Sequence, residues 1–242
     1  MNSSEIETII EKLRNQQPCI YKNSKKAHSN IVPYATYSPW LQDLEFRVIF
    51  EKINPNSLVD VYRCWELWNL AKQSLEVEGN ILEVGVWRGG TGALIADAIK
   101  SDLSKKVYLA DTFSGVVKSG ENDPYYNDGE HSDTTIDFVK NLLNSASLSN
   151  FELLQGVFPE DTGNLVQGKI SLLHCDVDVY QSTKDVVEWC LPKFTIGSII
   201  VFDDYGFYPC EGVTIFCEEF KSNKDFIFLH NLNGHAIFIK IK

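Results

Sequence analysis

Three aspartates in the second half of the chain have the residue type and position expected of a metal site. Asp176 follows an apolar run at 170–173, and Asp203 and Asp204 follow the longest apolar run, at 196–202. Because ligands of an open parallel sheet bind at the carboxyl ends of its strands, these side chains should converge. Carboxylates packed that closely repel one another unless a cation lies between them, and hard oxygen ligands favour Mg or Ca over zinc. The plainer alternative is that Asp203 and Asp204 cap the following helix, and His174 is expected to be a strand residue with a satisfied hydrogen bond.

A glycine-rich turn at 83–92 has the features of a ligand-binding loop. It reads Glu-Val-Gly-Val-Trp-Arg-Gly-Gly-Thr-Gly and lies between an expected strand and an expected helix. Its spacing differs from the dinucleotide fingerprint Gly-x-Gly-x-x-Gly, which argues against NAD. Glu83 could pair with an ammonium group while the N–H groups of the turn receive a carboxylate, so the amino acid end of S-adenosylmethionine would fit. The alternative is a tight turn that binds nothing.

Asp111 is the next candidate, at the end of the apolar run Val-Tyr-Leu-Ala over 107–110. In nucleotide-binding α/β folds, a carboxylate at this position accepts hydrogen bonds from the ribose hydroxyls. An aspartate that ends a strand is otherwise a helix cap or a turn residue. The glycine turn upstream favours the ribose interpretation.

The elements that must position these residues alternate between strands and helices, which predicts an α/β fold around a mostly parallel sheet. The last two strands are joined by a short connection that suits an antiparallel hairpin. A helix at about 6–13 opens an N-terminal helical extension, and the polar segment 115–133 is a candidate cover for the active site. Strands are expected at 81–84, 107–110, 151–155, 170–173, 196–202, 226–229 and 236–241, and helices at 58–74, 93–100, 134–143, 183–191 and 214–220.

Composition excludes several classes of function. The 242 residues include 33 Asp and Glu against 22 Lys and Arg, and the net charge of −11 makes nucleic acid an unexpected partner. The N-terminus lacks the features of a signal peptide, and no run reaches the roughly 20 apolar residues of a membrane span. The cysteines at 19, 64, 175, 190, 210 and 217 include no Cys-x-x-Cys pair. These features predict a soluble cytoplasmic protein with free, mostly buried thiols.

Four motifs occur in an order that resembles the macrocin and mycinamicin sugar O-methyltransferases. They are Leu-Glu-Val-Gly-Val-Trp-Arg-Gly-Gly at 82–90, Ala-Asp-Thr-Phe-Ser-Gly at 110–115, Asp-Val-Asp-Val-Tyr-Gln-Ser-Thr at 176–183 and Val-Phe-Asp-Asp-Tyr-Gly at 201–206. The resemblance runs from about Leu58 to the C-terminus. One departure is Asp176-Val177-Asp178, where the family has Asp-Gly-Asp.

The resemblance implies a class I methyltransferase: a Rossmann-like three-layer sandwich with a seven-stranded, mostly parallel sheet and an antiparallel C-terminal hairpin strand. It implies an N-terminal extension over 1–57, a methyltransferase domain over 58–242, S-adenosylmethionine as cofactor and Mg²⁺ or another divalent cation. The residues it assigns to the cofactor are Glu83, Gly85, Val86, Gly89 and Thr91 at the methionine end, Asp111, Thr112 and Phe113 near the ribose, and Gln155 and Gly156 near the adenine. Asp176, Asp203 and Asp204 match the metal carboxylates.

The implied reaction is transfer of the methyl group to a sugar hydroxyl of a natural product or glycoconjugate. A metal that binds two neighbouring hydroxyls would fix the geometry of an in-line displacement. Besides Asp176, Glu130 and His131 in the segment 115–133 are candidates for the catalytic base. Methylation of a catechol or an amine is an alternative, although Val179 stands where catechol enzymes commonly have a lysine. A catalytically silent assembly module is another, and a homo-oligomer formed through the N-terminal helices is compatible with each.

Overall fold

The computed structural model describes residues 2–15, 21, 24, 26–102 and 104–242, and the chain divides into two compact units, Met1–Pro39 and Trp40–Lys242. The first unit contains helix α1, Ser3–Arg14. Its N-terminus is closed by a capping box in which Asn2 and Glu5 each bond the other's backbone N–H. No residue of α1 is buried, and its apolar residues Ile6 and Ile9 are exposed.

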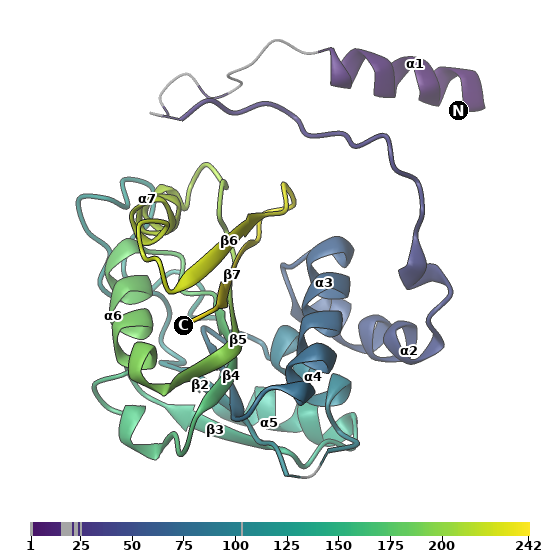
Figure 1. The fold of residues 1–242 in the computed structure, drawn as a ribbon. Helices are drawn as coiled ribbons and strands as arrows, with labels where there is room; N and C mark the ends of the chain where they lie inside the picture. The colour runs from purple at the N-terminus through teal and green to yellow at the C-terminus, as the bar shows by residue number, and fades with distance from the viewer. Residues whose placement is uncertain (1, 16–20, 22–23, 25, 103) are drawn as a thin grey trace. The chain divides into compact units, whose positions relative to one another are not determined.

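The second unit is built on a seven-stranded sheet with the strand order β3-β2-β1-β4-β5-β7-β6 (Figure 1). Strands β1 to β5 pair in parallel, whereas β7 runs antiparallel to both β5 and β6. This confirms the predicted mostly parallel sheet with an antiparallel C-terminal hairpin. The strands are β1 Asn80–Val84, β2 Val107–Asp111, β3 Phe151–Gln155, β4 Ile170–Cys175, β5 Phe194–Phe202, β6 Phe226–His230 and β7 Ala236–Lys240.

Helices cover both faces of the sheet, which confirms the predicted three layers (Figure 1). One hydrophobic core packs α2, α3, α4 and α5 against the sheet, and the other packs α6 and α7 against the opposite face. The helices are α2 Leu44–Ile53, α3 Val61–Gln73, α4 Gly90–Ala98, α5 Ile136–Ser145, α6 Tyr180–Cys190 and α7 Glu211–Phe220.

Helix α2 has no counterpart among the elements predicted within the N-terminal extension. The Asp43 side chain caps it by accepting a hydrogen bond from the N–H of Phe46. Phe46, Ile49 and Ile53 recur at helical spacing and are buried in the core that contains α4. The compact unit that holds the sheet therefore begins at Trp40, earlier than the expected boundary after residue 57.

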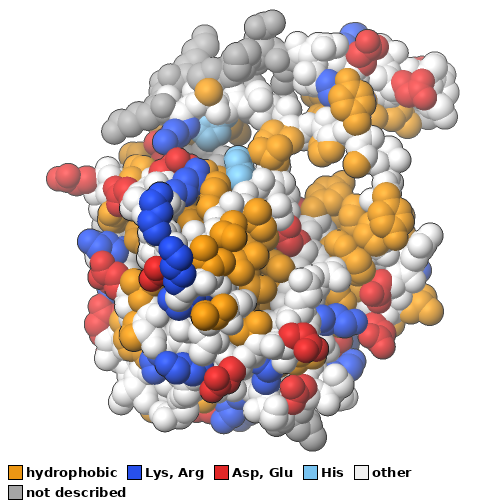
Figure 2. Space-filling view, viewed as in Figure 1, with side chains coloured by type: hydrophobic (Ala, Val, Ile, Leu, Met, Phe, Trp, Pro, Cys, Tyr) orange, Lys and Arg blue, Asp and Glu red, His pale blue; other side chains and the backbone are white. Residues whose placement is uncertain are grey.

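Several surface features follow from this architecture. Figure 2 shows hydrophobic side chains gathered over the β6–β7 hairpin, where Ile227 and Leu229 of the edge strand are 49% and 44% exposed. Homo-oligomer formation stays a prediction. None of the helices within the described residues combines the length and apolar character needed to cross a membrane. The five described cysteines are free and buried, as predicted, and Cys19 lies outside the described residues.

Candidate active site

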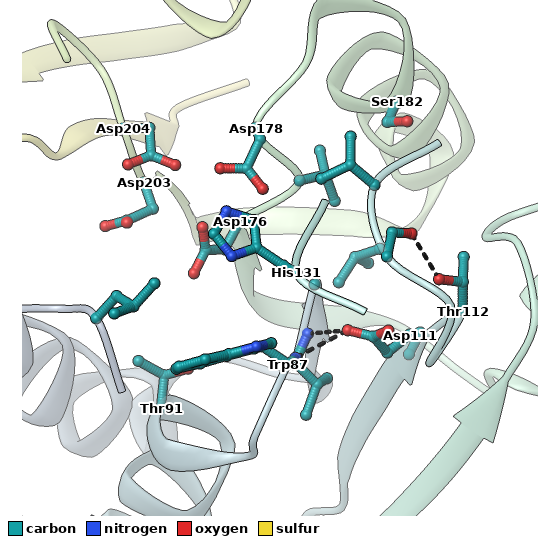
Figure 3. A pocket seen from close by; sticks show the side chains of 18 of the residues that line it. Trp87, Thr91, Asp111, Thr112, His131, Asp176, Asp178, Ser182, Asp203 and Asp204 are labelled. Carbon is teal, nitrogen blue, oxygen red and sulfur yellow. Dashed lines mark hydrogen bonds between the residues drawn. The ribbon is translucent and has the colours of Figure 1, made fainter. Parts of the chain in front are cut away.

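A cavity of about 250 Å³ opens at the carboxyl ends of β1, β2, β4 and β5. Figure 3 shows Asp111 and Thr112 on one side of it and the aspartates that follow β4 and β5 on the other. The segment 56–59 and the predicted cover segment, through Gly115, Val116, Val117, Tyr126 and His131, complete the wall. The sheet therefore brings the two groups of predicted residues to one cavity, as the rule for open α/β sheets requires.

The turn after β1 requires glycine at its first position. Gly85 has a φ of +88°, and a Cβ there would lie 1.6 Å from the backbone oxygen of Asp176. The same two segments are joined by a hydrogen bond of 2.9 Å from the N–H of Asp176 to the oxygen of Val84. The glycine turn and Asp176, the first of the predicted metal carboxylates, are therefore in direct backbone contact.

Asp111 lies at the end of β2 and is held by three backbone N–H groups. Its Oδ2 accepts hydrogen bonds from the N–H of Val86 at 2.7 Å and of Trp87 at 2.9 Å (Figure 3). Its Oδ1 accepts one from the N–H of Phe113 at 2.6 Å. A carboxylate has about four lone-pair sites, so this side chain can also accept one hydroxyl hydrogen of a ribose. Thr112 is fixed beside it by a hydrogen bond from Oγ1 to the oxygen of Gly115.

The structure brings some of the predicted cofactor residues to the cavity and leaves others away from it. Those that line it are Gly85, Val86, Thr91, Asp111, Thr112 and Gly156. Glu83, Gly89, Phe113 and Gln155 are outside the lining contributed by the described residues. Gly89 instead occupies the N-cap of α4, with a φ of +84°, Phe113 packs against the core, and Gln155 is exposed.

Glu83 was expected to pair with a ligand ammonium group, but its side chain is fully buried on the other side of β1. Its Oε1 lies 2.8 Å from Nδ1 of His174. Side chains alternate along a strand, so Glu83 and Ile81 face the core that contains α4, whereas Val84 faces the opposite core. Gly92 of α4 leaves space for the carboxylate, since a Cβ there would lie 2.6 Å from Glu83 Oε2.

Asp176, Asp203 and Asp204 line the cavity together, and one carboxylate oxygen of each lies within 4.8 Å of the others. Burial and the neighbouring carboxylates Asp203 and Asp204 raise the pKa of Asp176 well above its ordinary value. Burial and the charges of Asp203 and Asp178 do the same to the pKa of Asp204. A group of carboxylates whose ionised forms are destabilised in this way is suited to a divalent cation, which would lower these pKa values.

The charge of Asp203 is balanced by two basic side chains instead. Its Oδ2 lies 2.6 Å from Nη1 of Arg63 on α3, and its Oδ1 lies 2.9 Å from Nε2 of His235, just before β7. Burial would raise the pKa of Asp203, but the hydrogen bond and charge of His235 and the charge of Arg63 lower it to about 2. Asp203 is therefore the carboxylate of the group that is ionised without a metal.

Two further side chains of the cover segment, Tyr126 and His131, line the cavity near these aspartates. Tyr126 Oη donates a hydrogen bond of 2.9 Å to Oδ1 of Asp178, and burial of the phenol raises the pKa of Tyr126. His131 lies at the cavity, packed near the rings of Trp87 and Tyr126 (Figure 3). Glu130, the other candidate base, has its Oε1 bonded to the backbone N–H of Asn127 at 2.9 Å and is outside the described lining of the cavity.

The sequence model of the macrocin O-methyltransferase (TylF) family matches residues 61–239. The chain belongs to the macrocin O-methyltransferase family. The match covers the sheet up to the last residue but one of β7 and every residue of the acidic cluster, so the predicted resemblance is confirmed.

Relatives and solved structures agree with this family. The chain is 27% identical over 146 residues to the 8-demethyl-8-(2,3-dimethoxy-alpha-L-rhamnosyl)-tetracenomycin-C 4'-O-methyltransferase of Streptomyces olivaceus, covering 55% of this chain and 56% of the relative. It is 27% identical over 147 residues to the mycinamicin III 3''-O-methyltransferase of Micromonospora griseorubida, covering 55% and 58%. This chain therefore spans just over half the length of these curated relatives.

The fold is that of the O-methyltransferase NovP, with a TM-score of 0.68 at 20% identity over 77% of this chain and 82% of that one. The calicheamicin methyltransferase structure gives a TM-score of 0.65 at 20% identity over 85% and 94%. These similarities show the class I methyltransferase fold.

Three residues at or beside the family's site were not singled out from the sequence: Arg63, Tyr126 and His235. Arg63 lies on the predicted helix 58–74, where a charged residue is ordinarily exposed, but here it is 4% exposed. Tyr126 lies in the polar cover segment, and its aromatic character was the one available signal. His235 is a single residue in a hairpin connection, and only the pairing of Phe202 with Ala236 brings it beside Asp203.

Proposed function

We propose that the protein is an S-adenosylmethionine-dependent and divalent-metal-dependent O-methyltransferase that acts on a sugar hydroxyl of a natural product or glycoconjugate. The observation that carries the proposal is the backbone contact between Gly85 of the cofactor turn and Asp176 of the acidic cluster. A methyl donor held by the turn and a hydroxyl held at the cluster would lie in one cavity. The relatives named for sugar or antibiotic methylation support the acceptor class.

The residues present fit both groups. The glycine backbone of the turn and the N-terminus of α4, where Gly90 and Thr91 line the cavity, suit the amino acid end of S-adenosylmethionine. Asp111, held by backbone N–H groups, suits the ribose end. The all-oxygen set Asp176, Asp203 and Asp204 suits Mg²⁺. When bound, S-adenosylmethionine supplies the sulfonium methyl group, and the cation supplies a Lewis acid that lowers the pKa of a hydroxyl.

The chain itself would position the reactants and accept a proton. Asp111 would hold the ribose end of the donor, and Asp176 and Asp204 would hold the cation, which would supply a Lewis acid for the acceptor hydroxyl. Such positioning aligns the hydroxyl oxygen, the methyl carbon and the sulfur, which is where most of the rate gain of a displacement arises. His131 faces the same cavity, so we assign it the role of accepting the hydroxyl proton on a ring nitrogen. Glu130, bonded to Asn127, orients the cover segment instead.

Labelled methyl transfer to a panel of glycosides tests this function. The panel contains demethylated tetracenomycin, aminocoumarin and macrolide glycosides, with a catechol and an amine for comparison. We expect label on a sugar hydroxyl with Mg²⁺ and none in excess chelator. Asp204→Asn should lose transfer while binding S-adenosylhomocysteine with unchanged affinity, and the exposed Asp225→Asn is the matched control.

Each part of the proposal can fail separately. An undiminished rate in chelator would exclude the metal. Label on the catechol or the amine with none on any glycoside would exclude the sugar class. A folded protein that does not bind S-adenosylhomocysteine would exclude the cofactor and favour an assembly module.

A further inference from the structure

Behind the acidic cluster, the buried side chains of His174, His235 and Asp203 converge, with one possible ligand atom of each within 4.8 Å of the others. Nε2 of His235 lies 2.9 Å from Oδ1 of Asp203, whereas Nε2 of His174 has no hydrogen-bond partner among the described residues. Both histidines are 0% exposed and Asp203 is 3% exposed, so water cannot readily satisfy these atoms.

The opposite nitrogen of each imidazole is bound by a carboxylate. Nδ1 of His174 lies 2.8 Å from Oε1 of Glu83, and Nδ1 of His235 lies 2.7 Å from Oε2 of Glu66. Each carboxylate accepts the Nδ1 proton, so Nε2 of a neutral imidazole would carry the lone pair that a metal ion binds. A carboxylate on the far nitrogen is the arrangement that orients histidines bound to a metal and makes them more basic.

The three side chains can be satisfied by a proton or by a metal ion. One proton between His235 Nε2 and Asp203 Oδ1, which are 2.9 Å apart, would satisfy that pair but leave His174 Nε2 without a partner. A metal ion would satisfy all three atoms at once. Two ligands of a tetrahedral zinc ion are about 3.3 Å apart, so an opening of a few tenths of an ångström would admit one.

We propose that His174, His235 and Asp203 form a second metal site, which takes a first-row divalent cation of the zinc class. Two imidazole nitrogens and one carboxylate oxygen suit zinc, cobalt or iron, whereas the all-oxygen cluster beside them suits Mg²⁺. Asp203 belongs to both groups of possible ligands. Its Oδ1 lies in the histidine group, and its Oδ2 contacts Arg63. Such an ion would join β4, β5 and the β6–β7 hairpin directly behind the cavity. The site does not depend on the proposed reaction.

Cobalt binding tests the site because nitrogen ligands of Co²⁺ give intense visible absorption bands. The full-length protein is stripped of metal with a chelator, and Co²⁺ is titrated in excess Mg²⁺ to block the oxygen site. We expect one equivalent of Co²⁺ with nitrogen-type bands. His174→Gln and His235→Gln should each weaken binding at least tenfold. Glu66→Gln, which alters only the carboxylate behind His235, should weaken it about 10- to 100-fold.

Two controls separate this site from the oxygen cluster and from other histidines. His230→Gln changes a histidine of β6 outside the group and should leave the cobalt bands intact. Asp204→Asn removes an oxygen ligand of the proposed Mg²⁺ site and should also leave them intact. Circular dichroism and S-adenosylhomocysteine binding report whether each variant folds.

X-ray absorption spectroscopy of the zinc-loaded wild type gives an answer that does not depend on the variants. Two imidazole ligands would support the proposal. Oxygen-only coordination, or no cobalt uptake in excess Mg²⁺, would overturn it and show that a protonated His235 alone balances the group.

Discussion

Arg63 and Asp203 form a buried ion pair, with Nη1 of the arginine 2.6 Å from Oδ2 of the aspartate. The pair connects α3 to the carboxyl end of β5. Burial alone would lower the pKa of Arg63, but Asp203, Asp60 and Asp204 raise it above its ordinary value. The arginine is therefore a permanent charge that compensates the acidic cluster from behind.

Removing this arginine should destabilise the protein strongly. Arg63→Met leaves Asp203 buried with one oxygen unpaired, and the loss of one partner from a buried pair lowers the free energy of unfolding by about 3–5 kcal/mol. Urea unfolding measures the change. The control is Arg88→Met, which breaks an exposed pair with Asp133 and should cost about 1 kcal/mol or less. Equal effects of the two substitutions would contradict the assigned role of Arg63.

Cofactor affinity should depend on Asp111. In Asp111→Ala the N–H groups of Val86 and Trp87 lose their acceptor, and the ribose loses its carboxylate partner. We expect the affinity for S-adenosylhomocysteine to fall at least tenfold, about 1.4 kcal/mol. Calorimetric titration in the presence of Mg²⁺ measures it, with Asp225→Ala as the control. Unchanged affinity would mean that Asp111 only shapes the turn.

Stability should depend on pH in a way that a divalent cation reverses. Asp176 and Asp204 have raised pKa values in the folded protein, so their contribution is favourable at low pH and is lost as the pH rises through the ordinary aspartate range and above. Without metal, the melting temperature should therefore include a loss from these groups as the pH rises above about 4. Mg²⁺ should raise it more at pH 7.5 than at pH 5, as scanning calorimetry would show. If Mg²⁺ raised the melting temperature equally at both pH values, that result would contradict binding of the metal to these carboxylates.

Asp203 should behave in the opposite direction. Its pKa is lowered to about 2 in the folded protein, so its stabilising contribution is complete above the unfolded value of about 3.9 and is lost as the pH falls toward 2. His235→Gln removes one cause of the lowered pKa. Acid unfolding of this variant should begin at a higher pH than that of the wild type. His230→Gln is again the control, and coincident acid transitions would argue against the His235–Asp203 pair.

The turn after β1 should tolerate no side chain at its first glycine. In Gly85→Ala the new Cβ would meet the backbone of Asp176, and the φ of +88° is itself unfavourable for alanine. We expect loss of S-adenosylhomocysteine binding and a lower melting temperature. Gly120→Ala has open space around its Cβ and should behave as the wild type does. Retained binding in Gly85→Ala would show that the turn can rearrange.

The parts of the site that local patterns encode could be predicted from the sequence. The glycine turn, Asp111 and the aspartates after β4 and β5 each stand directly after an apolar run, and strand ends of a parallel sheet share one edge. The metal cluster follows from that rule without knowledge of any distance. Glu83 was expected to pair with the ammonium group of the ligand, but side chains alternate along β1, and its carboxylate lies on the face that packs against α4.

The parts that depend on long-range packing could not be predicted. Arg63 reaches Asp203 from α3, and His235 reaches it from a hairpin connection, so no spacing in the sequence links either residue to the site. His174 was expected to be a strand residue with a satisfied hydrogen bond. Its Nδ1 is bonded to Glu83 of β1, whereas its Nε2 is without a partner among the described residues.

The contact between Gly85 and Asp176 also bears on how the chain folds. The strands it joins are far apart in sequence, as the 91 positions between Glu83 and His174 show, and parallel pairing over such a separation forms slowly. On the ribosome, the cofactor turn cannot be completed until β4 and the residues after it have been synthesised. A nascent chain that ends before β4 offers no pocket to which S-adenosylmethionine could bind. The cofactor could therefore protect this protein from misfolding or proteolysis only late in its synthesis.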